Sequence, residues 1–346
     1  MRLIEYIIRR LALMVFVLFG VSVIVFYLSH GFPQAFNPLS AYIGPKMSPS
    51  VIEQIIESHG FNQPVYIQYF YWLRDLISGN WGTAGPWANG LPVYQVFVLR
   101  FPYTIELAVT AVILTVGIGI PLGIVSALKN NKLPDHLSRI VALTGYSTPS
   151  YWFGFVLQLV FFYYFYVWGL PNLPSHGAVS DSLQNAVSPI TGIPILDGLL
   201  AGNFNYAWDA FLHVLLPAFT LAFISLGQLA RIVRASMLEV LRQDYITLAR
   251  SKGLPERVVI FRHALRNALI PATTLTGLFL AALLGGALIT EFVFTWPGVG
   301  RLSLLAVFSG DANFIIFYTL ITAVIIVGAN LLVDVMYVFL DPRIKY

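Results

Sequence analysis

Long stretches free of Asp, Glu, Lys and Arg are the feature that most constrains the fold of this chain. A helix rises about 1.5 Å per residue, so roughly 20 apolar residues cross the hydrocarbon core of a membrane. Only 10% of the 346 residues are charged, which is too little to cover a soluble globule of this size. We therefore expect an all-α polytopic membrane protein, and the composition excludes a soluble enzyme, a nucleic-acid-binding module and a disordered chain. Six transmembrane helices are expected: Leu11–Ser29, Leu107–Leu128, Ile140–Trp168, Ala210–Ala230, Asn267–Thr290 and Ala312–Val333.

The first apolar run follows Arg2, Arg9 and Arg10, as the core of a signal peptide follows basic residues. The run is longer than a typical signal-peptide core, and no cleavage site of small residues comes after it. The next residues are His30-Gly31-Phe32-Pro33. We therefore expect a retained first span.

The lysines and arginines fall mainly on one side of these spans. If both termini are cytoplasmic, sixteen of the 20 lie inside: Arg2, Arg9, Arg10, Lys129, Lys132, Arg139, Arg231, Arg234, Arg242, Arg250, Lys252, Arg257, Arg262, Arg266, Arg343 and Lys345. The other four lie outside: Lys46, Arg74, Arg100 and Arg301. Cytoplasmic loops carry an excess of Lys and Arg, so the distribution predicts that both termini are cytoplasmic. It also explains the net charge of +4 without a nucleic-acid partner.

Two long segments are then extracellular, residues 30–100 and about 169–209. The first is rich in aromatic residues and is expected to hold a helix over Ser50–Ser58 and a glycine-rich loop over Gly79–Gly90. The second is rich in Pro, Ser, Asn and Gly and is expected to be a loop. The aromatic residues either form an interfacial belt or line a lid that contacts substrate, and the sequence leaves both open.

The connection from Arg231 to Arg266 is the most informative cytoplasmic segment. A helix is expected to end at Gly253, a residue suited to a helix terminus, and another to begin at Pro255. The expected apolar stripe of the second helix is Val258, Phe261, Leu265 and Ala268. Composition alone leaves two functions open, a helix pair on the lipid surface and a docking element for a cytoplasmic partner.

No catalytic or nucleotide-binding signature occurs in the sequence. The five lysines are followed by Met47, Asn130, Leu133, Gly253 and Tyr346, so there is no Walker A loop. Cysteine is absent, and neither an HExxH nor a G-x-S-x-G motif is present. We therefore expect no enzyme, no cofactor and no metal site, and any ATP hydrolysis would occur on another chain.

Few ionisable residues lie near the expected spans. Glu106, Glu291 and Asp334 are close to span ends, whereas an ion-coupled carrier usually keeps such groups near mid-membrane. The sequence therefore disfavours a secondary transporter. Glycines over 117–123 and 277–286 predict close helix packing, with a pathway-lining face as the alternative.

Several short motifs occur in order along nearly the whole chain. The strongest are Ala249–Leu254, Arg262–Pro271, Trp296–Arg301, Asn330–Asp334 and Leu340–Arg343, with weaker ones at Tyr6–Leu11, Gln63-Pro64, Gly119–Gly123 and Thr148–Trp152. With these motifs the chain resembles the membrane-spanning subunits of binding-protein-dependent ABC importers. It is most similar to the first permease subunit of the dipeptide/oligopeptide group.

The resemblance implies a type I ABC importer fold in which residues of about 231–268 form the EAA loop that docks on an ATPase subunit. The triplet that names this loop reads Thr247-Leu248-Ala249 here, so only Ala249 keeps the general pattern. The ATPase-coupling residues implied by the resemblance are Tyr245, Ala249, Gly253, Leu254, Arg262 and His263.

The resemblance also implies partners and a location. These are a second homologous permease subunit, two ABC ATPase subunits, an extracellular substrate-binding protein and the lipid of the plasma or inner membrane. Residues 1–100 would form an N-terminal transmembrane helix with an extracellular segment, and residues 101–346 a five-helix permease core that contains the coupling loop.

The implied substrates are di- and oligopeptides, and oligosaccharides are the alternative. Asn80 and Ala84 replace the Asp and Ser that the group tends to have, and the outer segment around 178–205 is longer than usual. Two other classes remain open from the residues alone. One is a channel or ion-coupled carrier that works without an ATPase, and the other is a scaffold or receptor that transports nothing.

Overall fold

The protein is described by a computed structural model over residues 3–31, 47–58 and 60–340, with side chains over 8–28, 47–58 and 60–333. Apart from one isolated bridge between Thr83 and Pro92, these residues form helices and their connections. The long helices are α1 (Leu3–Gly31), α4 (Val93–Leu128), α9 (Phe204–Val240) and α16 (Ala312–Leu340). The shorter helices are α2 (Pro49–Ser58), α3 (Val65–Ile77), α5 (Leu133–Ser147), α6 (Ser150–Gln158), α7 (Phe165–Val167), α8 (Pro194–Leu200), α10 (Asp244–Ser251), α11 (Glu256–Val258), α12 (Leu265–Ala268), α13 (Ile270–Leu284), α14 (Leu288–Val293) and α15 (Val299–Ser309).

Five helical segments within the described ranges are long and apolar enough to cross a membrane, and a bent pair makes a sixth. The five are Ile8–Leu28, Val93–Leu128, Ser150–Val167, Phe204–Val240 and Ala312–Val333, and the pair is Glu256–Ala268 with Ile270–Leu284. The expected polytopic all-α class is therefore confirmed. Expectations on Arg2, Lys46, Asp341 to Lys345 and the Asp334 side chain lie outside the described residues.

Helices α4 and α9 form the centre of the molecule. Gly123 makes their approach possible, because a Cβ there would lie 2.7 Å from the Ala230 carbonyl oxygen. Leu229 and Val233 of α9 are buried at the same contact, together with Ile124 of α4. The glycines of α4 thus do what the packing interpretation of residues 117–123 predicted, except Gly117, which has no neighbour within 4 Å of an added Cβ.

The expected third span, Ile140–Trp168, is wrong at its start. The helix breaks at Thr148, whose backbone is extended (φ −90°, ψ 124°), and α6 begins after Pro149. Proline disfavours a helical conformation in the residue before it, so the break has a local cause. Residues 140–147 belong instead to α5, which packs against α9.

The expected fifth span, Asn267–Thr290, is also divided. Its first residues lie in α12, the chain bends by 51°, and α13 holds Pro271 in its first turn. Gly286 ends the span in a left-handed conformation (φ +103°), with the Tyr318 hydroxyl beside it. The expected span includes Leu288–Thr290, which belong to the separate helix α14. Neither α14 nor α15 was expected as a helix of its own, because both are too short to give a spanning signal.

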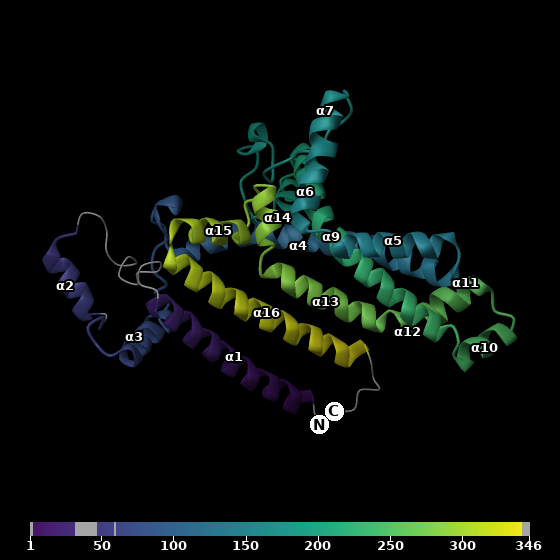
Figure 1. Ribbon diagram of the computed structural model, residues 1–346, viewed down its shortest axis with the longest axis horizontal. Helices are drawn as coiled ribbons and strands as arrows, with labels where there is room; N and C mark the ends of the chain where they lie inside the picture. Colours follow the sequence, from purple (N-terminus) through teal and green to yellow (C-terminus); the bar gives the residue numbers. More distant parts are fainter. Residues whose placement is uncertain (1–2, 32–46, 59, 341–346) are drawn as a thin grey trace.

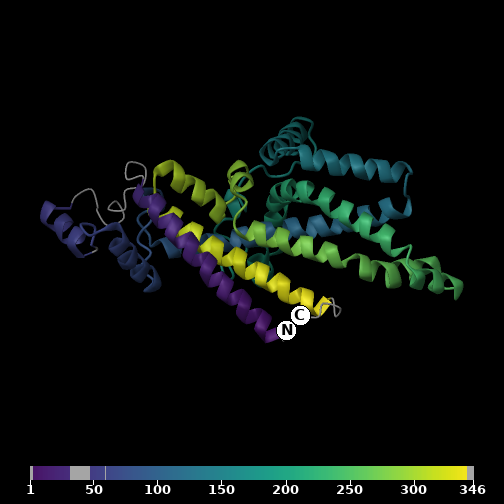
Figure 2. The same ribbon diagram turned by 60° about the horizontal axis from the view of Figure 1, so that its bottom comes forward.

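Figures 1 and 2 show α1 and α16 side by side, with the start of α1 and the end of α16 at one end of the bundle. Helix α12 joins α13 at that same end, and α10 and α11 lie beyond it. Helices α2 and α3 lie at the opposite end (Figure 1). The proposed division at residue 100 stays a prediction, and α4 runs through that position.

The aromatic residues of α3 partly fasten it to α1. Tyr69 is buried, and its ring lies 5.2 Å from that of Phe26. The Tyr69 hydroxyl is also 2.9 Å from the Ser22 hydroxyl of α1. Tyr66 and Phe70 are exposed, so one part of the cluster serves packing and the other remains available for the belt or lid that the sequence suggested.

Candidate functional site

The segment that follows α9 has the expected helix–glycine–helix form. Helix α10 ends at Ser251, and Gly253 adopts a left-handed conformation (φ +74°) that only glycine enters without strain. Its backbone N–H donates to the Arg250 carbonyl at 2.9 Å, which completes the turn. Pro255 is extended (φ −56°, ψ 137°) and precedes α11. The turn at Gly253 therefore sets the angle between the two arms of the segment.

One face of α10 is buried in the main core. Ile246 is fully buried and Ala249 is 7% exposed, and both pack in a cluster with Val233, Met237 and Val259. The opposite face carries Tyr245 and Leu248, which are 40% and 56% exposed. The element is thus held firmly on one side and presents apolar side chains on the other.

Two polar contacts fix the arms to one another. The Arg250 guanidinium donates twice to the Glu256 carboxylate, at 2.7 and 3.2 Å, across the Gly253 turn. The Asn267 amide donates to the Tyr245 hydroxyl at 2.8 Å and so ties α12 to α10. Both ion-pair partners are about half exposed. The pair therefore orients the two arms but adds little to the free energy of unfolding.

The apolar stripe expected for the second arm is wrong in register. Residues Val259–Ala264 form a π-helical turn, in which the backbone takes an extra residue per turn. The turn buries Val259, Ile260 and Ala264, whereas Phe261 is 54% exposed. Of the expected stripe, Ala268 is buried, Leu265 packs against the core while partly buried, and Val258 is half-buried. Phe261 is thus a further exposed apolar side chain of this segment, in addition to Tyr245 and Leu248.

The implied coupling residues differ in their surroundings. Tyr245, Gly253, Leu254 and Arg262 are exposed, and His263 is half-buried. Ala249 points into the core, where its small methyl group lets α10 lie close to α9 and to the π-helical turn. Coupling to an ATPase stays a prediction for the five accessible residues, and together with Leu248 and Phe261 they are named the coupling surface from here on.

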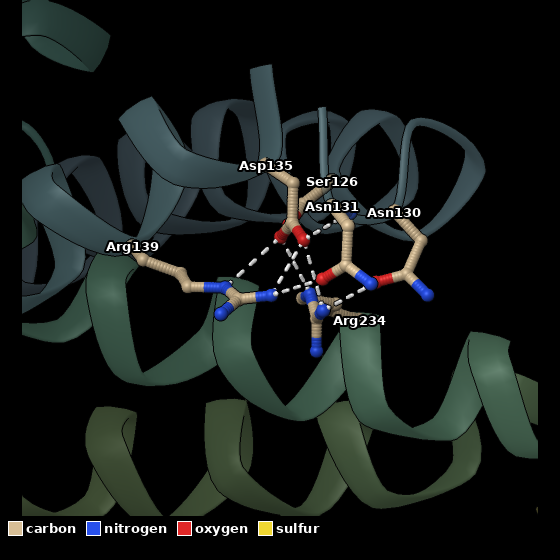
Figure 3. A network of polar contacts seen from close by, with 6 residues as sticks. All are labelled: Ser126, Asn130, Asn131, Asp135, Arg139 and Arg234. Atoms are coloured by element: carbon tan, nitrogen blue, oxygen red, sulfur yellow. Dashed lines mark hydrogen bonds and ion pairs between the residues drawn. The ribbon is translucent and has the colours of Figure 1, made fainter. Parts of the chain in front are cut away.

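A buried carboxylate at the start of α5 links that helix to α4 and α9. Asp135 is fully buried at the start of α5 and accepts hydrogen bonds from the Ser126 hydroxyl at 2.6 Å and the Asn131 backbone N–H at 2.9 Å. Figure 3 shows two arginines reaching the same carboxylate from α5 and α9. Arg139 donates at 2.6 Å, and Arg234 donates at 2.7 and 3.0 Å.

This network joins the α4–α5 connection to α9 at Arg234, ten residues before the start of α10 at Asp244. Arg234 also donates to the Asn130 side chain at 2.8 Å (Figure 3). The guanidinium groups of Arg234 and then Arg139 hold the pKa of the Asp135 carboxyl well below its usual range. Asp135 is therefore a charged anchor, and sequence reasoning did not single it out.

A second buried carboxylate organises the opposite end of the molecule. Glu291 is fully buried and accepts from the Thr104 hydroxyl at 3.0 Å and the Arg301 backbone N–H at 2.9 Å. A Cβ at Gly298 would lie 2.5 Å from a Glu291 carboxylate oxygen, so only glycine fits there. The motif Trp296–Arg301 is thereby folded around Glu291, and its conformation has a structural cause.

Comparison with known proteins identifies the family. The model of the family described as "Binding-protein-dependent transport system inner membrane component" matches residues 119–346. The model described as "Binding-prot-dependent transport system membrane comp, N-term" matches residues 3–108.

Curated relatives match over nearly the whole chain. The probable D,D-dipeptide transport system permease protein DdpB of Escherichia coli K12 is 40% identical, over 96% of this chain and 94% of the relative. The dipeptide transport system permease protein DppB of Alkalihalophilus pseudofirmus is 38% identical, over 99% and 100%. The oligopeptide transport system permease protein AppB of Bacillus subtilis is 35% identical, over 99% of both chains. The resemblance stated from the motifs is confirmed, and the chain belongs to the family of inner-membrane components of binding-protein-dependent transport systems.

Proposed function

We propose that this chain is a permease subunit of an ATP-driven importer of di- and oligopeptides. The names of the relatives that match it over nearly their full length support peptides as the substrate and give no support to oligosaccharides. The chain forms the pathway together with a second homologous permease subunit, and an extracellular binding protein delivers the peptide to the outer segments. Both termini are cytoplasmic, in agreement with the distribution of Lys and Arg.

The observation that carries the coupling role is the two-sided segment after α9. Its inner face is packed in the core through Ile246 and Val259. Its outer face presents Tyr245, Leu248 and Phe261, all at least 40% exposed. Exposed apolar side chains grouped on a rigid element are typical of an interaction surface. The ATPase subunit is the partner, and it holds the coupling surface.

Force then passes from the ATPase to the spans by way of this segment. When the ATPases close, the coupling surface moves with them, and its buried face carries α9 and α13 along. The Asp135 network moves the α4–α5 connection with α9, because Arg234 and Asp135 are joined by two hydrogen bonds. The pathway alternates between outward and inward access as a result.

Gly253→Arg tests the coupling role. The substitution places a long cation on the coupling surface and strains a left-handed turn (φ +74°), but no heavy atom lies within 4 Å of the added Cβ. We expect the complex to assemble, while peptide uptake and peptide-stimulated ATP hydrolysis fall about ten-fold or more. Gly202→Arg is the matched control for backbone strain, since Gly202 is also left-handed (φ +68°) with nothing within 4 Å. It lies in the outer segment just before α9, so assembly of the complex and ATP hydrolysis without peptide should match the wild type. Unchanged uptake in the Gly253 variant would remove the coupling assignment.

Reconstitution separates this proposal from the other classes of function. The complete complex in liposomes is expected to take up peptide only when ATP is present on the side of the membrane where the ATPase subunits lie. If the purified chain alone moves peptide along an ion gradient, it is a carrier. If neither preparation moves peptide but both bind it, the chain is a receptor.

A further inference from the structure

A polar pocket of about 720 Å³ lies far from the coupling surface. Its lining includes Arg100 and Tyr103 near the start of α4 and Tyr206 and His213 near the start of α9. The Asp135 network lies at the other end of α4, where Ser126 takes part in it. A helix of 36 residues is about 54 Å long, so the pocket belongs to the end of the molecule that the proposed topology makes extracellular. Its volume is in the range of sites for small organic ligands.

The walls of this pocket are fixed by hydrogen bonds. Asp209 of α9 accepts from the Ser180 hydroxyl at 2.6 Å and the Ser180 backbone N–H at 2.7 Å. The Gln158 amide donates to the Ser175 carbonyl at 2.7 Å, and the Gly177 N–H donates to the Phe294 carbonyl at 3.1 Å. The 174–185 wall is thereby attached to α6, α9 and the end of α14. The pocket exists before any ligand arrives.

Two arginines face this pocket without a carboxylate partner. Over the described part of the chain, neither Arg100 nor Arg301 makes an ion pair. Arg301 gives one weak side-chain hydrogen bond, to the Thr295 carbonyl at 3.3 Å. Burial, and then the charge of Arg100, lowers the pKa of Arg301, so the two cations lie close enough to affect each other. Arg74, by contrast, pairs with Asp75 at 3.0 Å.

The rest of the lining is suited to a small zwitterion. Among the described residues, Asp181 is the one acidic residue that lines the pocket, and it supplies the opposite charge. Tyr103, Phe162 and Tyr206 supply aromatic surface. Two guanidinium groups in the lining of one preformed pocket favour an anion, and Arg binds carboxylates through two parallel hydrogen bonds.

We propose that this pocket binds the carboxylate of an incoming peptide through Arg100 and Arg301. The inference rests on the proposed function, because peptide import is what brings a carboxylate to this surface. The C-terminal carboxylate and an acidic side chain share this chemistry. The two arginines hold the peptide at the outer end of the permease, and the aromatic residues cover its apolar part.

Uptake by the complete transporter in liposomes, with its binding protein, tests the proposal. The substrates are dialanine, dialanine amide, and alanyl-glutamate amide, whose only carboxylate is on the side chain. In the Arg100→Gln, Arg301→Gln double variant, we expect uptake of dialanine at low concentration to fall about ten-fold and uptake of dialanine amide to stay unchanged. Alanyl-glutamate amide distinguishes the two carboxylate sources, since it follows dialanine only if a side-chain carboxylate is accepted.

Two further variants separate charge from structure. The Arg100→Lys, Arg301→Lys double variant keeps the charge but loses the bidentate geometry, so part of the preference for dialanine over its amide should return. Arg74→Gln removes a paired arginine that does not line the pocket and should behave as the wild type.

Three results overturn the proposal. The first is an unchanged ratio of dialanine to amide uptake in the double variant. The second is an equal loss for both substrates with a raised half-saturating concentration of binding protein, which would make the arginines a docking contact. The third is a wild-type transporter that takes up no peptide, which overturns the proposed function as well and is seen without any variant.

Discussion

At the scale of single residues, Asp135 accepts hydrogen bonds from four other residues of the described chain. It is fully buried, and two arginines from different helices donate to it. Removing one partner of a buried ion pair leaves an uncompensated charge, at a cost of about 3–5 kcal/mol. The sequence shows that Asp135 can carry a negative charge, but its partner Arg234 is 99 residues away along the chain. No local pattern connects residues that far apart, so the network could not be predicted.

Asp135→Asn should therefore destabilise the protein strongly. We expect a loss of roughly 3 kcal/mol in the free energy of unfolding, because Arg234 keeps its position but loses its counter-charge. Thermal unfolding in detergent measures it. Arg139→Gln is the control and should cost about 1 kcal/mol or less, since the Arg139 side chain is 46% exposed. Equal losses in the two variants would mean that Asp135 is not the centre of the network.

The lowered pKa of Asp135 also gives a pH dependence. A carboxyl whose pKa is lower in the folded state stabilises the fold fully above its unfolded pKa, and this contribution disappears only as the pH falls through the folded value. The difference in melting temperature between wild type and Asp135→Asn should thus stay constant between about pH 5 and about pH 8. A difference that shrinks within that range would contradict a charged Asp135.

At the scale of elements, the closest helix contact is that of α4 with α9. Gly123→Ala would place a methyl group 2.7 Å from the Ala230 carbonyl oxygen and from the Val233 Cβ. Overpacking of this kind costs about 1–3 kcal/mol, so the melting temperature should fall by several degrees. Gly117→Ala on the same helix meets nothing within 4 Å and should be neutral or slightly stabilising. Similar losses of melting temperature in both variants would show that helix propensity, and not the contact between α4 and α9, determines the effect.

Elements differed in how far the sequence could predict them. Apolar length located the spans, and glycine and proline located the turn between Gly253 and Pro255, because these signals are local. Pro149 is also a local signal for a helix break at Thr148. The prediction of the third span gave more weight to the length of the apolar stretch and so missed this break. The π-helical turn over Val259–Ala264 could not be found in this way, because periodicity analysis assumes 3.6 residues per turn.

At the scale of the whole molecule, the topology can be tested directly because the chain has no cysteine. His136→Cys and Ser188→Cys each introduce a single exposed thiol, one in α5 and one in the connection before α8. A membrane-impermeant maleimide should label the Ser188 variant in intact cells. The His136 variant should be labelled only in inside-out vesicles. The reverse pattern would invert the proposed orientation of both termini.

Helix α9 runs without interruption from Phe204 to Val240, with Pro217 inside it. Tyr206 stands in the outer pocket and Arg234 in the Asp135 network, so one rod of 37 residues, about 55 Å long, touches both. A tilt of about 5° would displace one end of such a rod by about 5 Å relative to the other. A tilt of α9 that accompanies closure of the ATPases would therefore displace the lining of the outer pocket as well, because one continuous helix holds residues of both sites.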